Sequence, residues 1–386
     1  MKEQLVWAEV DLNAIAFNVK QLKGIVGPQT RLMTVVKADG YGHGAVEVAK
    51  VAIQSGAEAL GVARLHEAIE LREANVKVPI LIFGYTFPER AHDLAVFRLT
   101  QTLFSYESAK MLADAAVSLR KRIKVHIKVD TGMGRVGMTP YRSSHPVPTR
   151  PRLEEVAKEI KRIGDLPGLE LEGVYTHFAT ADHLDRSYAG KQLELFQDIL
   201  RRLRRLGMRP VLAHTANSAA TIDLPESHLD MVRTGIATYG LQPSDEPSKR
   251  RVDLKPALQL KTKVIQVKKV PPRFKVSYGC TFETRSDTRI ATLPIGYADG
   301  LDRRLSSQGH ALVRGESAPI IGRICMDLTM LDVGHISDVE VGDEVVIIGA
   351  QEDRQITAAE IASRLNTIHY EIVSTITARV PRFYLR

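Results

Sequence analysis

A lysine stands directly after an apolar run near the start of the chain. Leu32–Val36 predicts a buried strand, and Lys37 follows it at once. An apolar setting lowers the pKa of an amine, and a neutral amine is what Schiff-base formation with an aldehyde requires. Gly40, Gly42 and Gly44 then allow the backbone to turn sharply or to approach a ligand closely. Lys37 is therefore a candidate cofactor lysine; the alternative is a surface lysine beside an ordinary turn.

Other chemically versatile residues lie at the ends of predicted strands in the same way. They are Lys128 with Asp130, His177, Asn217 with Ser218, and Arg233 with Gly235. In an eight-stranded α/β barrel, catalytic residues gather at the C-terminal ends of the strands, so we expect these residues to share one site with Lys37. Taken singly, a histidine near a strand end is about as often structural as catalytic. Asn217 and Gly235 also fit an ordinary turn.

The elements that would position these residues alternate in type along the first two-thirds of the chain. The predicted strands are Leu32–Val36, Ala59–Ala63, Val78–Phe83, Thr100–Phe104, Ile123–Val129, Leu169–Thr176, Pro210–His214 and Leu229–Val232. Helical patterns lie between most of them, for example Ala45–Ser55, Leu65–Ala74, Ser108–Leu119, Leu153–Ile163 and Tyr188–Leu206. This alternation predicts a parallel sheet, and eight strands favour closure into a TIM-type barrel of ~250 residues. The fourth run is partly polar and is the weakest of the eight.

The rest of the chain is rich in short strands punctuated by glycine. The predicted strands are Leu258–Val270, Arg289–Leu293, Ala311–Val313, Ala318–Ile321, Thr329–Val333, Glu344–Ile348 and Ile376–Leu385. One helix, Thr357–Leu365, begins with a capping threonine and has Glu360 three residues later. The polar stretch Gln242–Arg251 is typical of a linker. The predicted domains are an α/β barrel at 1–243 and a mainly β domain at 244–386.

The chain has a formal net charge of +8 over 386 residues. Its densest basic cluster, RRLRR at 201–205, lies in a predicted helix whose apolar residues follow the helical period. We therefore expect these arginines to form the solvated face of that helix, and no nucleic-acid partner is expected. A positive potential favours anionic ligands such as a phosphate-bearing cofactor.

Cysteine content and hydropathy indicate the compartment. Cys280 and Cys325 are the only cysteines, too few for a disulfide framework, and they fit a reducing environment. No apolar run is long enough to cross a bilayer, and the first residues show no secretory signal. We expect a cytoplasmic protein that has no membrane partner.

A series of motifs resembles, in order, those of the alanine racemase family of pyridoxal-phosphate enzymes (fold type III). They are VVKADGYGHG at 35–44, KVDTGMGRVG at 128–137, YTHFATAD at 175–182, HTANSAA at 214–220, VRTGIATYG at 232–240, VSYGCTF at 276–282, IGYADG at 295–300, GRICMD at 322–327 and HYEI at 369–372. The lysine motif is shared more widely among pyridoxal-phosphate barrels, whereas several of the others are specific to amino-acid racemases. The resemblance covers essentially the whole chain.

The resemblance implies racemisation by two opposed acid/base groups. Lys37 would hold the cofactor as a Schiff base and act on one face of the substrate Cα. Tyr278 would act on the other face, reaching in from the second subunit of a homodimer with shared active sites. Racemisation needs a proton donor opposite the base, and the cofactor supplies the electron sink. Without the resemblance, Tyr278 is typical of a packing residue in a β domain.

The resemblance also assigns contacts to the cofactor phosphate. Tyr41, Ser218 and Tyr370 would hold it through their hydroxyl groups, with help from the backbone of Gly235 and Ile236. This agrees with the physical expectation that phosphate binds at the loops after the seventh and eighth strands of such a barrel.

Arg233 would contact the pyridine nitrogen, with His177 and Asn217 also beside the cofactor. Arginine donates a hydrogen bond without giving up its proton. We therefore hypothesise that Arg233 keeps the cofactor a moderate electron sink and limits transamination. His177 is expected to hydrogen-bond to Arg233 or to Tyr278.

Two residues are implied as substrate contacts, namely Arg135 and the backbone N–H of Met326. In the family a carbamylated lysine fixes the arginine, and Lys128 occupies that position. A carbamate turns a cation into an anion that pairs bidentately with guanidinium. The alternative is an unmodified Lys128 paired with Asp130. No residue is assigned as a metal ligand.

The expected activity is interconversion of L-alanine and D-alanine, supplying D-alanine for peptidoglycan. A racemase of another small amino acid such as serine is the first alternative. A non-enzymatic pyridoxal-phosphate carrier would have no need of the second domain, and a decarboxylase of the same architecture takes larger substrates. The proline-rich basic stretch at 139–152 is longer than the family's usual connection, and a tolerated surface loop is its default interpretation.

Overall fold

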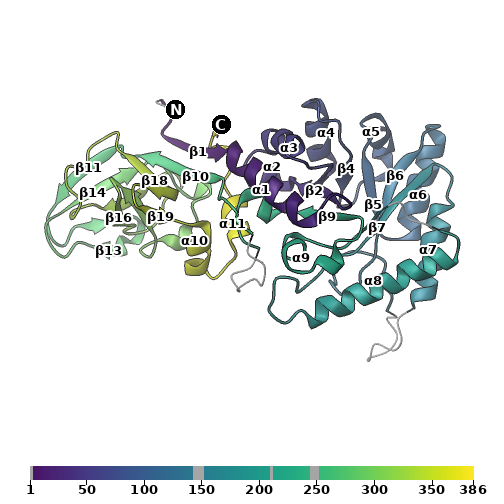
Figure 1. The fold of residues 1–386 in the computed structure, drawn as a ribbon. Helices are drawn as coiled ribbons and strands as arrows, with labels where there is room; N and C mark the ends of the chain where they lie inside the picture. The colour runs from purple at the N-terminus through teal and green to yellow at the C-terminus, as the bar shows by residue number, and fades with distance from the viewer. Residues whose placement is uncertain (1–2, 142–151, 209–211, 244–251) are drawn as a thin grey trace. The chain divides into compact units, whose positions relative to one another are not determined.

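The computed structural model describes residues 3–141, 152–208, 212–243 and 252–386 (Figure 1). Their contacts divide them into two compact units. The barrel unit comprises Ile15–Gly40 and Ala45–Lys255; the β unit comprises a first segment ending at Ala14, Tyr41–Gly44 and Pro256–Arg386. A single boundary at 243/244 therefore misses two short segments that belong with the C-terminal part. Most of the predicted linker, and most of the 139–152 stretch, lies outside the described residues.

The barrel unit contains eight parallel strands, as predicted. They are β2 (Arg31–Val35), β3 (Ala59–Val62), β4 (Ile80–Ile82), β5 (Thr100–Leu103), β6 (Ile123–Lys128), β7 (Leu169–Tyr175), β8 (Leu212–His214) and β9 (Met231–Thr234), paired in the order β8-β7-β6-β5-β4-β3-β2-β9. Bonds beside β8 and β9 nearly close the ring: the N–H groups of Asp230 and Arg233 donate to the carbonyls of Ala213 and Ala216, each at 3.0 Å.

The partly polar strand β5 is buried throughout. Most of its polar side-chain atoms are paired inside the unit: the Gln101 amide donates to the carbonyls of Gly84 (2.6 Å) and Thr102 (2.8 Å), although Gln101 Oε1 has no partner among the described residues. The Thr102 hydroxyl lies 3.1 Å from the Tyr175 hydroxyl. Buried polar groups are tolerated when they are paired in this way.

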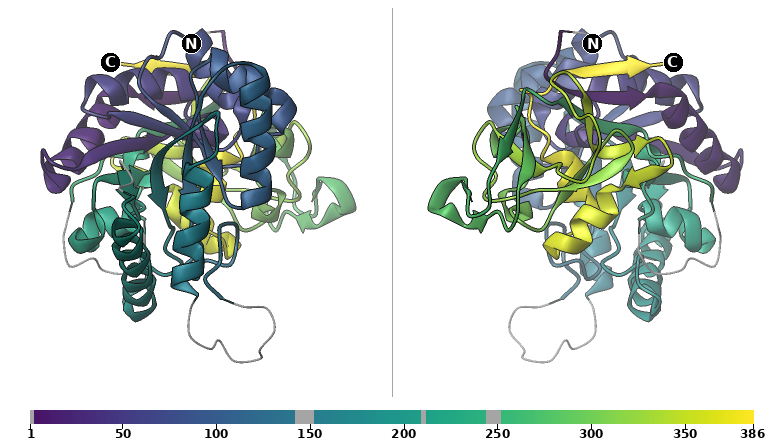
Figure 2. Two further views of the ribbon diagram at one scale, coloured as in Figure 1. Left: turned by 90° about the vertical axis from the view of Figure 1, so that its right-hand side faces the viewer. Right: turned by 90° about the vertical axis from the view of Figure 1, so that its left-hand side faces the viewer.

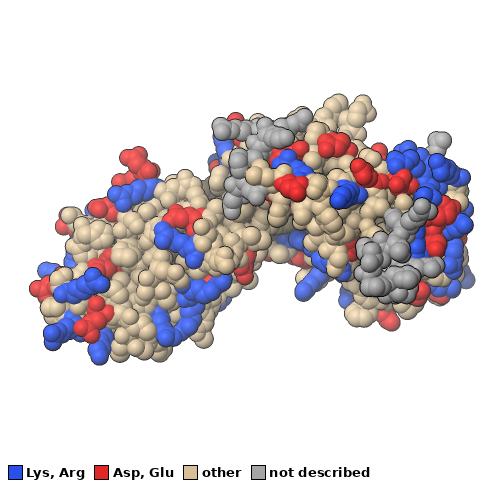
Figure 3. All heavy atoms as spheres, turned by 90° about the horizontal axis from the view of Figure 1, so that it is seen from below, with Lys and Arg blue, Asp and Glu red and all other residues tan. Residues whose placement is uncertain are grey.

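Helices lie outside the strands of the barrel unit (Figure 2). They are α1 (Leu12–Val26, which begins in the β unit), α3 (Ala45–Gln54), α4 (Leu65–Glu73), α5 (Ala91–Val96), α6 (Tyr106–Ser118), α7 (Leu153–Gly164), α8 (Ser187–Arg205) and α9 (Ser218–Asp223). On α8, Phe196, Ile199 and Leu203 are buried whereas Arg201 and Arg205 are exposed, which confirms the solvated basic face. Basic and acidic side chains are interspersed on the face shown in Figure 3. None of the described helices is long and apolar enough to span a membrane.

The β unit is built from two main sheets and a hairpin. One sheet has the order β16-β15-β18-β10-β1-β20, with β19 paired to β18, and the second has the order β11-β14-β17. The strands are β1 (Val6–Asp11), β10 (Leu258–Lys263), β11 (Gln266–Val270), β12 (Lys275–Val276), β13 (Phe282–Glu283), β14 (Thr288–Leu293), β15 (His310–Val313), β16 (Glu316–Pro319), β17 (Thr329–Asp332), β18 (Glu344–Gln351), β19 (Arg354–Ile356) and β20 (Arg382–Leu385). The helices are α10 (Ala358–Leu365) and α11 (His369–Ser374).

Two predicted strands of the β unit were wrong in extent. Leu258–Val270 is two strands, because the Val264 N–H donates to Asp343 while the next N–H, of Ile265, donates to Thr292, so the chain changes sheets there. The last strand begins only at Arg382, since a turn and a bend at residues 378–380 precede it. The predicted helix cap is confirmed, with the Glu360 N–H donating to the Thr357 hydroxyl at 3.0 Å.

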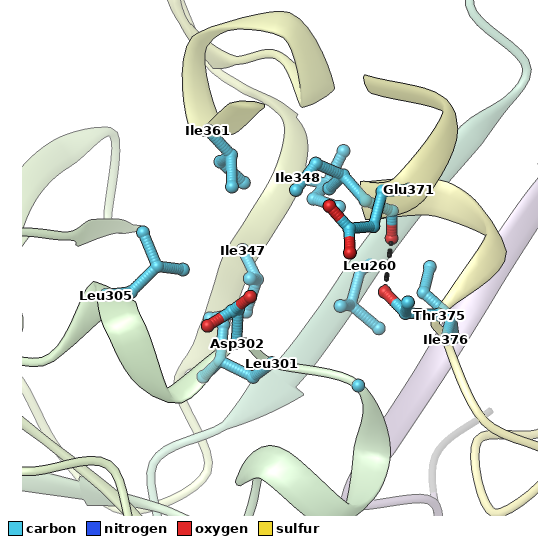
Figure 4. A pocket seen from close by; sticks show the side chains of 12 residues that line it. Leu260, Leu301, Asp302, Leu305, Ile347, Ile348, Ile361, Glu371, Thr375 and Ile376 are labelled. Atoms are coloured by element: carbon cyan, nitrogen blue, oxygen red, sulfur yellow. Dashed lines mark hydrogen bonds between the residues drawn. The ribbon is translucent and has the colours of Figure 1, made fainter. Parts of the chain in front are cut away.

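A small apolar pocket lies inside the β unit (Figure 4). Leucine and isoleucine side chains form most of its wall, and Asp302 and Glu371 are its two carboxylates. Its volume is about 20 Å³, which is room for roughly one water molecule. This pocket is therefore too small to receive an amino acid.

Candidate active site

Lys37 lies at the end of β2, where the backbone enters a left-handed turn. Ala38, Asp39 and Gly40 have φ values of 51°, 51° and 59°. This conformation costs a non-glycine residue about 1–2 kcal/mol, so the surrounding structure must hold the turn in place.

Glu67 of α4 holds that turn from one side. One of its carboxylate oxygens accepts the Ala38 N–H at 2.7 Å, and the other accepts the N–H groups of Ala63 (2.7 Å) and Arg64 (2.9 Å) at the end of β3. On another side, the buried Tyr239 hydroxyl donates to the Val35 carbonyl at 2.9 Å. The backbone around the lysine is thus tied to two neighbouring elements.

The surroundings of Lys37 favour its neutral amine. Burial lowers the pKa of the ammonium group, the Arg135 guanidinium lowers it further, and the Glu67 carboxylate raises it in part. This lowering of the Lys37 pKa agrees with the expectation from the apolar strand that precedes it.

Arg233 is buried at the end of β9 and is surrounded by acceptors. Its guanidinium donates to the carbonyls of Thr176 (2.8 Å) and Thr215 (2.9 Å), and lies 2.8 Å from His214 Nδ1 and 3.2 Å from His177 Nδ1. Burial lowers the pKa of Arg233 to about 10, which leaves it a cation at neutral pH. Within the described ranges no carboxylate forms an ion pair with it. The predicted support of Arg233 by His177 is therefore present.

The two histidines beside Arg233 are neutral. Burial, followed by the Arg233 charge, holds the pKa values of His177 and His214 well below the ordinary value. Because a guanidinium can only donate, both Nδ1 atoms must accept, and each ring carries its proton on Nε2.

Lys128 is buried at the end of β6 and has lost much of its preference for the charged state. Burial, then Arg135 and Arg233, lower the pKa of its amine to about 8. The Asp130 carboxylate is occupied elsewhere, since it accepts the backbone N–H groups of residues 132–135 at 2.8–3.1 Å. No ion pair joins Lys128 to Asp130 in the part of the chain that the structure describes. Asp130 instead shapes the loop that carries Arg135.

Ser218 lies where two backbone N–H groups converge after β8 and β9. Its hydroxyl accepts the N–H of Gly235 at 2.9 Å and the N–H of Ala237 at 3.5 Å, on either side of the buried Ile236. The Asn217 side chain caps α9 by accepting the Ala220 N–H at 3.0 Å. The Ser218 hydroxyl and the two backbone N–H groups form a small polar site. The side-chain oxygen of Asn217 instead serves as the N-cap of helix α9.

The β unit holds the remaining predicted residues in two groups. The rings of Tyr41 and Tyr370 lie near each other, with centroids 6.3 Å apart. Tyr278 is 71% exposed and Met326 is 52% exposed, on two loops joined by a hydrogen bond from the Ser277 hydroxyl to the Arg323 carbonyl (2.6 Å).

Sequence reasoning missed two residues that organise the site. Glu67 clamps the lysine turn, and its signal was its position in the first turn of the helix after β3. His126 lies behind His214, with ring nitrogens 2.9 Å apart, and its signal was its alternation with Lys128 on β6.

These features define a class of enzyme: an α/β barrel with a partly buried lysine of lowered pKa and a cationic site at its strand ends, followed in the chain by a β unit. The N-terminal domain model of alanine racemase matches residues 10–243, and the C-terminal domain model matches residues 257–384. The chain belongs to the alanine racemase family. It is an amino-acid racemase, an isomerase.

Known relatives support this assignment over the full length of the chain. An alanine racemase of Desulfosudis oleivorans is 52% identical and covers 100% of this chain and 97% of its own. An alanine racemase of Desulforamulus reducens is 49% identical over 100% of both chains. Among solved structures, the alanine racemase of Bacillus anthracis with bound L-Ala-P matches with a TM-score of 0.90 at 41% identity, covering 99% of this chain and 95% of that one.

Proposed function

We propose that this protein interconverts L-alanine and D-alanine with pyridoxal phosphate bound at Lys37. The observation that carries the proposal is the partly buried Lys37 amine of lowered pKa, set in a strand-end site with the buried cation Arg233. The Bacillus anthracis relative, whose structure holds L-Ala-P, supports alanine as the substrate. Serine differs by one hydroxyl and is the alternative substrate.

The residues present fit this cofactor. A neutral lysine amine suits a Schiff base with its aldehyde, and the Ser218 hydroxyl with the backbone at Gly235 and Ile236 suits its phosphate. Arg233 is a donor without a carboxylate partner among the described residues, which suits a pyridine nitrogen. Tyr41 and Tyr370 would add phosphate contacts from the β unit. The cofactor, when bound, supplies the electron sink that acidifies the substrate Cα–H.

The protein's own groups would then move one proton on each face of Cα. The Lys37 amine takes or gives the proton on one face, and the Tyr278 hydroxyl does so on the other. Arg135 orients the substrate carboxylate, and the backbone N–H of Met326 donates to it. Exchange of roles between Lys37 and Tyr278 gives racemisation in either direction.

We further propose that Tyr278 and Met326 act in the active site of a second copy of the chain. Both side chains are mostly exposed within the chain, and Leu328 beside them is 39% exposed. Their loops are tied together through Ser277, so they would enter a neighbouring site as one piece. A homodimer with shared active sites follows.

The Lys128 amine is proposed to be carbamylated. Its pKa of about 8 leaves roughly a tenth of the amine neutral at pH 7, far more than in an ordinary lysine, and only the neutral amine reacts with carbon dioxide. The product is an anion that would pair with Arg135. The proposed setting is the cytoplasm, with D-alanine supplied to peptidoglycan.

Incubation of the purified protein with pyridoxal phosphate and L-alanine in D2O tests the function. We expect D-alanine that carries deuterium at Cα, and its loss in Lys37→Ala and Tyr278→Phe. Tyr106→Phe, on helix α6, is the matched control and should keep full activity. Deuterium exchange at Cα without inversion of configuration would contradict the two-group mechanism. Faster turnover of serine than of alanine would mean that serine is the substrate.

A further inference from the structure

A line of polar side chains runs through the interior of the barrel unit away from Arg233. Arg233 Nη1 lies 2.8 Å from His214 Nδ1, and His214 Nε2 lies 2.9 Å from His126 Nδ1. His126 Nε2 lies 3.8 Å from a carboxylate oxygen of Glu172. The Glu172 carboxylate accepts from Lys124, whose side chain is half exposed.

Strand β7 has an irregularity and a glycine beside His126. Val125 pairs with Leu171 but His126 pairs with Gly173, so Glu172 is an extra residue in β7, a β-bulge. Bulges re-aim a side chain relative to regular pairing. A Cβ on Gly173 would lie only 2.7 Å from His126 Cε1, so the ring occupies space that a side chain would otherwise take.

The protons in this line have a defined direction. Arg233 can only donate, so His214 accepts at Nδ1 and carries its proton on Nε2. That N–H then donates to His126 Nδ1, which leaves the His126 proton on Nε2, facing Glu172. Every N–H in the line therefore points from Arg233 towards the carboxylate.

The far end of the line is an anion. His126, and then Lys124, hold the pKa of the Glu172 carboxyl at about 2. The Thr100 hydroxyl donates to the carboxylate oxygen that faces His126, at 3.2 Å. Glu172 is therefore held in place as the anion that the His126 N–H faces, at 3.8 Å, a charge contact longer than a hydrogen bond.

The His214 ring is held in its plane as well. It stacks on the Tyr175 ring with centroids 4.7 Å apart and planes 6° apart. The Tyr175 hydroxyl is in turn bonded to Thr102. Rotation of His214 away from Arg233 would break this stack.

We propose that His126 and Glu172 are positioning residues that keep His214 an acceptor for Arg233, and so fix the guanidinium that faces the cofactor ring. The role of Arg233 towards the cofactor rests on the proposed function, whereas the direction of the protons does not. Protonation of His126 would set its Nδ1–H against the His214 Nε2–H. The charged or titratable groups facing His126 are Lys124 on β6, Glu172 on β7, His214 on β8 and Arg233 on β9.

Nitrogen NMR of the cofactor-loaded protein, labelled with ¹⁵N-histidine, tests the direction without any variant. We expect His126 and His214 to be neutral with the proton on Nε2 at pH 7, signals being assigned through His126→Asn and His214→Asn. A proton on Nδ1 of His126, or a charged His126 ring, would overturn the proposal. In Glu172→Gln we expect the His126 proton to stay on Nε2, because the Arg233 end of the line sets it, while the Nε2 signal shifts as a neutral amide replaces the carboxylate; an unchanged His126 signal would remove Glu172 from the line.

Kinetics test the consequence for catalysis. His126→Leu leaves the His214 N–H without an acceptor, and we expect kcat to fall about 10- to 100-fold with the alanine KM within about threefold. His126→Asn places an amide oxygen near the Nδ1 position and should recover most of the loss. Equal kcat values for the leucine variant and the wild type, or for the leucine and asparagine variants, would overturn the proposal.

A control separates this effect from the general cost of losing a histidine. His310 of the β unit is partly buried beside Glu360 at 3.3 Å, so His310→Leu removes a similar pair outside the barrel, and its kcat should not change. Absence of alanine racemisation by the wild-type protein would overturn the proposed function. The tautomer measurement would still decide whether the line of protons exists.

Discussion

Buried basic groups without carboxylate partners dominate the strand-end site of the barrel unit. Lys128 and Arg233 are each 3% exposed, and within the described residues neither makes an ion pair. An uncompensated buried charge costs several kcal/mol, which is the reason the pKa of each group falls. A site of this kind is completed by an anionic ligand or by a modification that creates an anion.

Lys128 is the residue at which such a modification is expected. With ¹³C-labelled bicarbonate, we expect a carbamate signal in the carbon NMR spectrum of the wild-type protein and none in Lys128→Met. Lys124→Met is the matched control on the same strand, because its bond to Glu172 raises the pKa of Lys124 and disfavours the neutral amine. A signal that persists in Lys128→Met would place the carbamate elsewhere.

Arg233 is expected to control which reaction follows proton removal. In Arg233→Glu an acidic partner replaces a permanent donor, and the ratio of pyruvate formed to alanine racemised should rise roughly tenfold or more, by analogy with typical single-group effects. The variant should also lose stability, since its carboxyl group would face the carbonyls of Thr176 and Thr215. An unchanged ratio in folded protein would contradict this role.

The strand-end residues were predictable because they follow directly from apolar periodicity. Lys37, Lys128, His177 and Arg233 each lie at or just after a strand end, as the sequence indicated. His126 was not predictable, because its partner His214 is 88 residues away and their contact depends on the closed ring of strands. The role of Tyr278 rests on family resemblance, since its exposed position says only that it is available.

At the scale of the element, the left-handed turn after β2 depends on helix α4. Glu67→Gln would turn an amide NH2 towards a backbone N–H, so at least one of the three backbone N–H groups would lose its charged acceptor. We expect the free energy of unfolding in urea to fall by about 1–3 kcal/mol and kcat to fall with it. Glu47→Gln on α3, which removes only an exposed pair with Lys50, should change stability by less than about 0.5 kcal/mol. Equal effects in the two variants would contradict the clamp.

Elements whose type follows from local pattern were predicted, and elements set by distant pairing were not. The capped helix α10 and all eight barrel strands have local signals in capping residues and apolar runs. β1 was not among the predicted strands, and its pairing with β10 and β20 joins residues from both ends of the chain. The break between β10 and β11 is likewise a change of partner within one continuous run.

At the scale of the whole molecule, the same difference between local sequence pattern and distant pairing explains why the domain boundary was predicted incompletely. Family models and sequence pattern both divide the chain near residue 250. The contacts between residues in the structure instead place the first strand, β1, and Tyr41–Gly44 in the β unit. No local property of these short segments marks them as part of a later domain, so only the folded contacts reveal it.

Acid should destabilise the barrel unit because several of its histidines are held neutral. Burial keeps the pKa values of His126, His177 and His214 below the ordinary 6.5. The unfolded chain therefore binds more protons than the folded one below pH 6.5, and stability is full above that pH and falls as the pH drops. Well below pH 6.5, each histidine that stays neutral in the folded protein contributes at most about 1.4 kcal/mol per pH unit, and the three together at most roughly 4 kcal/mol per unit.

Unfolding in urea, followed by circular dichroism from pH 7.5 to 5.5, measures this slope. His126→Asn should flatten it by about a third, since one of the three groups is gone. The low pKa of Glu172, about 2 against its ordinary 4.5, adds a second window in which stability is lost only as the pH falls below about 4.5. A free energy of unfolding that stays constant between pH 7.5 and 5.5 would mean that these histidines take up protons in the folded barrel as readily as in the unfolded chain, and the directed line from Arg233 to Glu172 would then be broken below about pH 6.5.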